Sequence, residues 1–186
     1  MKSILITGIS ALALAGAMSA QAQVATVNRA ISEAEVLSAQ QGWCKALVDI
    51  SAAHTNAGQA AAKALAEKVI DAAYGYQMGA VLFKPTLTAN PQTFRTTRAG
   101  ALSYFVGGDP AFPKDTGFAL KGWIKCEPAN AAIFIAGDNA STLGKVHFTA
   151  KDGKVTSVDK TWSFVKDDAG KLRIVVHHSS LEYAGG

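Results

Sequence analysis

Two histidines and two serines follow one another near the end of the chain, at His177, His178, Ser179 and Ser180. Side chains alternate between the two faces of a strand, so His177 and Ser179 share one face while His178 and Ser180 share the other. An imidazole changes charge near neutral pH, and a hydroxyl both donates and accepts hydrogen bonds. On the concave face of a curved sheet such a pair would line a polar pocket, whereas on the outer face it would meet water. Arg173, on the same face as His177, favours the outer face.

The other candidate groups predict less chemistry. His54 and His147 are far from this pair in the sequence, and no spacing assembles the three or four ligands of a metal site, so neither a metal nor another cofactor is expected. Asp159 lies in the middle of a predicted strand and would suit a general base in an isomerase-like pocket, but an aspartate there is more often a solvated surface residue. The sequence contains no nucleophile elbow and no phosphate-binding glycine loop.

The elements that must position these residues begin with helices. Ser32 and Glu35 have the spacing of a capping box, and apolar residues repeat at helical period from there to Ile50. After a loop over residues 54–58, a second amphipathic helix carries an apolar stripe from Ala62 to Tyr74. A third, short helix is predicted over 98–106 and ends at a glycine pair.

Strand signals dominate the rest of the chain. The period changes to alternation over 81–87, where Pro85 indicates an edge strand or a bend. Further strands are predicted over 118–127, 131–136, 142–151, 154–166 and 171–180, separated by turns rich in glycine, asparagine and aspartate. Helices first and strands afterwards predict an α+β domain, in which a curved antiparallel sheet wraps the helices.

The first residues have the layout of a secretory signal peptide, with Lys2, an apolar stretch from Ile4 to Ala17, and small residues before a cleavage site after Ala22. The apolar run is too short for a membrane anchor. We therefore expect a signal peptide over 1–22 and one domain over 23–186, periplasmic or secreted and not membrane-bound after cleavage. The formal net charge of +4 is spread without a long basic run, which makes nucleic acid an unfavoured partner.

Cys44 and Cys126 are the two cysteines of the chain. An oxidising compartment would allow them to form a disulfide, and two buried free thiols that behave as small apolar residues explain them equally well.

Four segments together resemble the iota-class carbonic anhydrases, over about residues 34–183. They are Phe83-Lys84-Pro85-Thr86, the stretch 100–108 with sequence GALSYFVGG, the stretch 164–168 with sequence FVKDD, and the stretch 172–181 with sequence LRIVVHHSSL. The resemblance implies a nuclear-transport-factor-2-like cone, similar to the association domain of calcium/calmodulin-dependent kinase II, with N-terminal helices packed in a curved antiparallel sheet. It also implies a homodimer.

By the same resemblance, the activity is the reversible hydration of carbon dioxide to bicarbonate, without a metal. Thr86, Tyr104, Ser179 and His177 would form the site that holds bicarbonate. The three hydroxyls would hydrogen-bond the oxygens of the anion and orient the attacking water, while His177 would accept or relay the proton near neutral pH.

Two other functions fit this fold class, because fold alone does not define activity. One is a noncatalytic domain for small-ligand binding or oligomerisation, which would bind anions without turnover. The other is an isomerase or cyclase, which would need a deep apolar pocket with one inward-facing carboxylate.

Overall fold

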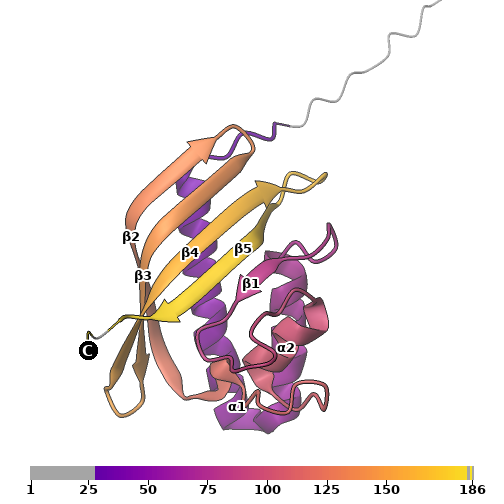
Figure 1. Cartoon of the computed structure of the whole chain (residues 1–186), viewed down its shortest axis with the longest axis vertical. Helices are drawn as coiled ribbons and strands as arrows, with labels where there is room; N and C mark the ends of the chain where they lie inside the picture. Colours follow the sequence, from indigo (N-terminus) through magenta and orange to yellow (C-terminus); the bar gives the residue numbers. More distant parts are fainter. Residues whose placement is uncertain (1–27, 184, 186) are drawn as a thin grey trace, which may run out of the picture.

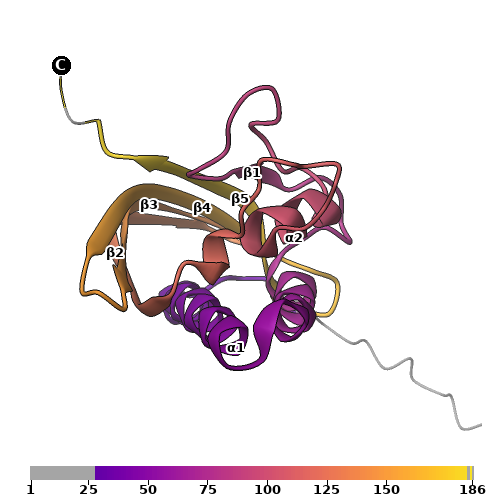
Figure 2. The same cartoon turned by 90° about the horizontal axis from the view of Figure 1, so that it is seen from below.

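The computed structural model describes residues 28–183 and 185. The predicted signal peptide over 1–22 lies outside these residues. A five-stranded sheet arches over a long helix, and a shorter helix lies beside one edge of the sheet (Figures 1 and 2). The elements are α1 (Glu33–Ala73), β1 (Leu82–Lys84), α2 (Arg98–Val106), the 3-10 helix η1 (Phe118–Leu120), β2 (Trp123–Ala136), β3 (Asn139–Ala150), β4 (Val155–Lys166) and β5 (Leu172–Leu181).

The helix α1 joins the two helices that the sequence predicts. Its N-terminus carries the expected capping box, in which the Ser32 hydroxyl accepts from the Glu35 backbone N–H and the Glu35 carboxylate accepts from the Ser32 backbone N–H. The expected loop over 54–58 is reduced to one residue, Gly58, which has φ +79° and ψ −174°. A residue with a side chain rarely adopts this backbone geometry, so the glycine lets the helix break sharply and continue.

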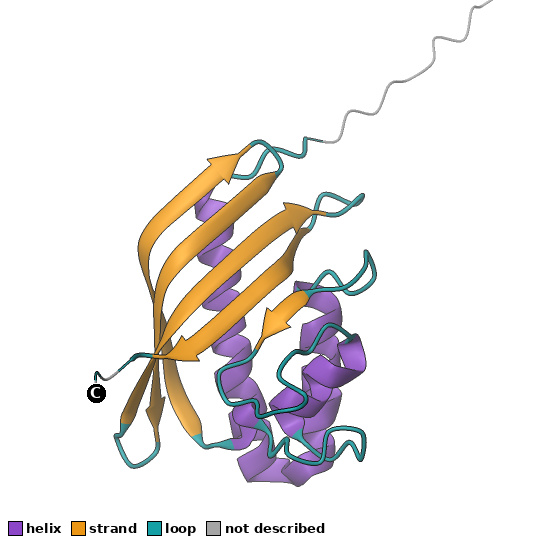
Figure 3. Ribbon diagram, in the orientation of Figure 1, coloured by secondary structure: helices purple, strands orange, loops and turns teal. Residues whose placement is uncertain are grey.

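The sheet has the order β1-β5-β4-β3-β2. The four strands from β2 to β5 form the expected antiparallel meander, but β1 pairs with β5 in parallel, with Phe83 opposite His177. The predicted antiparallel sheet is confirmed for β2 to β5, and the parallel pairing of β1 makes the whole sheet mixed (Figure 3). Alternation of side chains indicates which face a strand residue occupies and not in which direction the strand runs, which is why the sequence did not reveal this pairing.

The strand β2 is also longer than predicted. It runs without a turn through Pro128 and Asn130, and a shift in its register with β3 lies between Asn130 and Ala132. Gly144 of β3 pairs with Asn130, and a Cβ atom at Gly144 would lie 2.2 Å from the carbonyl oxygen of Ala129. The irregular strand therefore continues because its neighbour has no side chain at this position. The predicted strand start at 118–120 is instead the helix η1.

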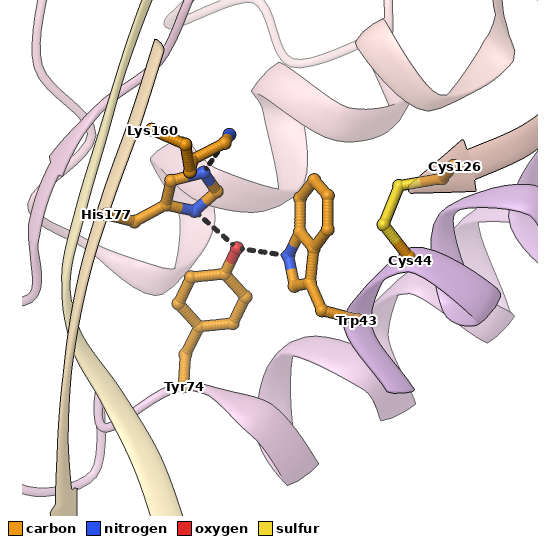
Figure 4. Close-up of a disulfide and its surroundings, with 6 residues drawn as sticks. All are labelled: Trp43, Cys44, Tyr74, Cys126, Lys160 and His177. Carbon is orange, nitrogen blue, oxygen red and sulfur yellow. Dashed lines mark hydrogen bonds between the residues drawn. A yellow bond between two sulfur atoms is a disulfide. The ribbon is translucent and has the colours of Figure 1, made fainter. Parts of the chain in front are cut away.

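The inner face of the sheet packs on α1 and α2 to form one aromatic-rich core. A disulfide between Cys44 and Cys126 joins α1 to β2 beside this core (Figure 4), which resolves the two alternatives for the cysteines. Within the described residues, no helix is long and apolar enough to span a membrane.

Candidate functional site

The site begins with an irregularity in β5 that decides which side chains point inward. Ile174 pairs with Phe164 and Val176 pairs with Ser163, so Val175 is an extra residue in β5 at this point. The simple alternation expected from the sequence is shifted there, and His177 and Ser179 both face the core, with 2% and 1% of their surface exposed. Arg173 does not share their surroundings, because it pairs with Asp167 at 2.8 Å. The argument that Arg173 favoured a solvent-facing His177 is therefore wrong.

The hydroxyls of Thr86, Tyr104 and Ser179 come from separate elements and lie near the C-terminal end of β5, on the inner face of the sheet. Thr86 follows β1 through Pro85, and its Oγ1 lies 2.5 Å from Oγ of Ser179. Tyr104 of α2 is 5% exposed, and burial raises the pKa of its phenol while the neighbouring polar groups of Leu87 and Thr86 oppose that rise. The structure thus brings together Thr86, Tyr104 and Ser179, which the resemblance assigns to one site.

His177 lies next to this group but deeper, with both ring nitrogens engaged by protein side chains. Its Nδ1 is 2.8 Å from the hydroxyl of Tyr74, which also accepts a hydrogen bond of 2.9 Å from the indole N–H of Trp43. Its Nε2 is 2.7 Å from Nζ of Lys160 (Figure 4). The ring of Phe83 stacks on the imidazole at a centroid distance of 4.3 Å. His177 is therefore held between Tyr74, at the C-terminal end of α1, and Lys160 of β4, rather than presented to solvent.

The electrostatics of this pair differ from what the sequence predicts for His177. Burial, together with the charge of Lys160, lowers the pKa of His177 well below its usual value. Burial also lowers the pKa of Lys160, from 10.5 to about 7. A neutral imidazole here is a poor acceptor for a proton near neutral pH, and Lys160 is the group whose charge changes in that range.

Sequence reasoning missed Lys160, although a signal for it was present. The buried residues of β4 alternate as Val158, Lys160, Trp162 and Phe164, so Lys160 occupies a position that the pattern reserves for core residues. Lysine is almost never fully buried without a partner, and a lysine in register with large apolar residues marks a functional candidate.

The remaining candidate residues lie away from the three hydroxyls of Thr86, Tyr104 and Ser179. Asp159 is half exposed and pairs with Lys145 at 3.0 Å, as expected of a surface aspartate. His147 bonds the Ser157 hydroxyl at 2.7 Å, and His178 is exposed on the outer face. No cluster of three or more His, Cys, Asp or Glu side chains suited to a metal ion occurs among residues 28–183.

An open cleft of about 820 Å³ lies near the end of α1 and the turn between β4 and β5. Four of its charged lining residues pair with one another, Arg98 with Asp71 at 2.5 Å and Arg173 with Asp167 at 2.8 Å. The fifth, Asp168, pairs with Arg29 at 2.6 Å. We assign the functional site to the buried hydroxyls and not to this cleft, because the charges that line the cleft are already paired within the protein.

A curved sheet wrapped around helices, with polar groups buried at its inner face, defines a domain of the nuclear-transport-factor-2-like fold. One solved structure with this fold, from Xanthomonas campestris and assigned to the calcium/calmodulin-dependent protein kinase II association domains, superposes with a TM-score of 0.53. It is 23% identical and covers 87% of this chain and 95% of its own, so it supports the fold alone.

The family follows from the sequence comparisons. Residues 34–181 match the model of the metal-independent carbonic anhydrases, and the chain belongs to that family. A metal-independent carbonic anhydrase from Nostoc sp. is 67% identical over 157 residues, which is 84% of this chain and 77% of the relative. The crystal structure of a cyanobacterial iota-carbonic anhydrase complexed with bicarbonate is 64% identical, with a TM-score of 0.84, and covers 88% of this chain and all of the other. The predicted family and fold are thereby confirmed.

Proposed function

We propose that this chain catalyses the reversible hydration of carbon dioxide at the group formed by Thr86, Tyr104 and Ser179. The observation that carries the proposal is the contact of 2.5 Å between the Thr86 and Ser179 hydroxyls, beside a buried tyrosine. The relative that is 64% identical was solved as a complex with bicarbonate, which supports the same ligand here.

The three hydroxyls suit bicarbonate because the anion is small and planar and its oxygens accept hydrogen bonds. When water attacks carbon dioxide, an O–C bond forms, one C=O electron pair moves onto oxygen, and a proton leaves the water. Hydroxyl donors that are already in place stabilise the negative charge that develops on the carbon dioxide oxygens, and burial of the site strengthens these bonds. Family membership makes a metal-bound hydroxide unnecessary, so charge stabilisation and proton transfer rest on side chains.

The test is stopped-flow hydration of carbon dioxide by the mature domain after exhaustive chelation, with the metal content measured on the same sample. Thr86→Val removes one hydroxyl and keeps the shape of the side chain, and we expect the turnover to fall about 100-fold, as on removal of an oxyanion donor. Thr88→Val is the matched control, because the Thr88 hydroxyl bonds only backbone carbonyls of its own loop, among them that of Thr93 at 2.7 Å.

Three results would contradict this account. Equal activity of Thr86→Val and wild type would remove that hydroxyl from the mechanism. Turnover only after metal addition would assign the chemistry to an ion. Bicarbonate binding by the wild type, seen by ¹³C NMR, without any turnover would favour the noncatalytic binding domain.

The protein is, we further propose, exported, with its signal peptide cleaved after Ala22. The disulfide between Cys44 and Cys126 supports this proposal, because such bonds form and persist in oxidising compartments. N-terminal sequencing of protein from periplasmic and culture fractions should begin at Gln23. Full-length protein confined to the cytosolic fraction would contradict export.

A homodimer through the outer face of the sheet is the assembly we propose. Phe134 and Leu143 lie diagonally across β2 and β3 on this face and are 68% and 56% exposed. Apolar side chains exposed side by side favour burial against a second copy. Sedimentation should give a dimer for the wild type and a monomer for Phe134→Glu with Leu143→Glu, and a monomeric wild type would contradict the proposal.

A further inference from the structure

We propose that the Lys160 amine is the proton acceptor of the hydration reaction, held by His177 beside the hydroxyl pair of Thr86 and Ser179. This inference rests on the carbonic anhydrase activity proposed above. It assigns the proton that leaves the attacking water to a group in β4 that the resemblance does not include.

The register of the sheet places Lys160 between the two parts of the site. Lys160 pairs directly with Ser179, and His177 pairs with Trp162, one step along the same face. Directly paired side chains lie about 5 Å apart at Cβ, and diagonal neighbours are within reach of a long side chain. The Lys160 side chain therefore starts opposite Ser179 and carries its amine to Nε2 of His177, at 2.7 Å.

The lysine nitrogen is buried but incompletely satisfied. Only 4% of the Lys160 surface is exposed. Within residues 28–183, its nitrogen forms one hydrogen bond, to His177, and no ion pair with a carboxylate. An amine has two N–H groups and a lone pair, so two of its three positions are open to a water molecule or a bound oxyanion.

Burial of the Lys160 nitrogen favours the neutral amine when no anion is bound. The rings of Trp43 and Trp162 lie 5.0 and 5.3 Å from Nζ and would favour an ammonium, but burial dominates and lowers the pKa of Lys160 to about 7. The other titratable groups packed around it are His177 of β5, Tyr74 at the end of α1 and Tyr104 of α2, while the Lys84 amine of β1 bonds the Ser179 backbone carbonyl. The carboxylates that approach this side are ion-paired, Asp115 near Tyr104 with Arg95 at 2.6 Å and Glu35 of α1 with Lys166 of β4 at 2.8 Å. The carboxylate of Asp159 lies on the opposite face, paired with Lys145.

His177 completes the arrangement because one of its ring nitrogens can donate a hydrogen bond while the other accepts one. Proton acceptance by Lys160 requires the tautomer with the proton on Nδ1, in which the Tyr74 hydroxyl accepts from both His177 and Trp43 and keeps its own O–H for a water molecule, while Nε2 accepts an N–H from Lys160. The lysine lone pair then stays free for the proton of the attacking water. As the O–C bond forms, the water proton moves to the amine, which leaves bicarbonate beside an ammonium; that ammonium later gives its proton to buffer. His177 keeps the same tautomer throughout.

The first test compares Lys160→Met with wild type in stopped-flow hydration across pH. The methionine retains the length of the side chain and removes the base, so we expect the turnover to fall about 100-fold or more, which is the range of general base catalysis, with little change in KM. The wild-type rate should fall as the pH drops below about 7, because the amine is then protonated, and this step should be absent from the residual activity of the variant. Lys154→Met, at an exposed turn, is the matched control.

A second measurement needs no variant to fold. In wild-type protein labelled with ¹³C at lysine Cε, one resonance should titrate near neutral pH, and its midpoint should rise when bicarbonate binds, because the anion favours the ammonium. The proposal is overturned if no lysine resonance titrates below about pH 9. It is also overturned if Lys160→Met keeps the wild-type turnover and pH profile, or if ¹³C-labelled carbon dioxide gives a lysine carbamate, whose nitrogen cannot serve as the base. A wild type without hydration activity would instead refute the proposed function.

Discussion

The burial of Lys160 should make the stability of the protein depend on pH in a way that one substitution removes. The lysine pKa is 10.5 in the unfolded chain and about 7 in the fold, so between these values the unfolded state binds a proton that the folded state does not. Stability therefore rises with pH over this range, by about 1.4 kcal/mol per pH unit. Between about pH 7.5 and 9.5, two pH units, Lys160 contributes a rise of about 2.7 kcal/mol.

Urea unfolding of wild type and Lys160→Met, with the disulfide intact, measures this term. The difference in unfolding free energy between variant and wild type should fall by about 2.7 kcal/mol from pH 7.5 to 9.5, with the variant the more favoured at the lower pH. Changes in packing at the methionine cancel in this comparison, and the tyrosines titrate alike in both proteins. Lys154→Met should instead run parallel to wild type. Parallel curves for Lys160→Met and wild type would refute a neutral buried lysine and the mechanism built on it.

Two further predictions concern the fold that holds the site. Replacing Cys44 and Cys126 by serine opens a cross-link between residues 82 apart in sequence, and urea unfolding should show a loss of about 4.5 kcal/mol, within the range for native disulfides; a loss under about 1 kcal/mol would contradict this estimate. Gly144→Ala places a Cβ 2.2 Å from the Ala129 carbonyl oxygen, so we expect at least about 2 kcal/mol of destabilisation, by the same assay; wild-type stability would show that β2 moves aside freely.

Most of the fold could be predicted from local patterns in the sequence. The capping box at Ser32, the helix that ends at Gly107 and the three turns that join β2 to β5 each depend on neighbouring residues, and each lies where it is predicted, whereas the turn expected at Asn130 is continuous strand. The parallel pairing of β1 with β5 and the extra residue at Val175 depend on contacts between segments distant in the chain. Alternation read from one strand alone has no information about either feature.

The same distinction applies to the site. Thr86, Tyr104, Ser179 and His177 were identified through family motifs, and the structure brings the three hydroxyls together. The surroundings of His177 were not predictable, because its partners come from two other elements. Lys160 differs, since its alternation with the core residues of β4 is a local pattern that indicates a buried lysine.

Burying Lys160 has two consequences of opposite sign. An amine that is neutral near pH 7 is a base available for catalysis, yet the same shift in pKa costs the fold about 4 to 5 kcal/mol at that pH. A domain with a typical stability of about 5 to 15 kcal/mol cannot absorb such a cost without compensation. The disulfide is of comparable magnitude and lies beside this site, because Cys44 follows Trp43, whose indole N–H bonds Tyr74. We therefore expect the protein with both cysteines replaced to be least stable at neutral pH and below, where the cost of the buried lysine adds in full to the loss of the disulfide.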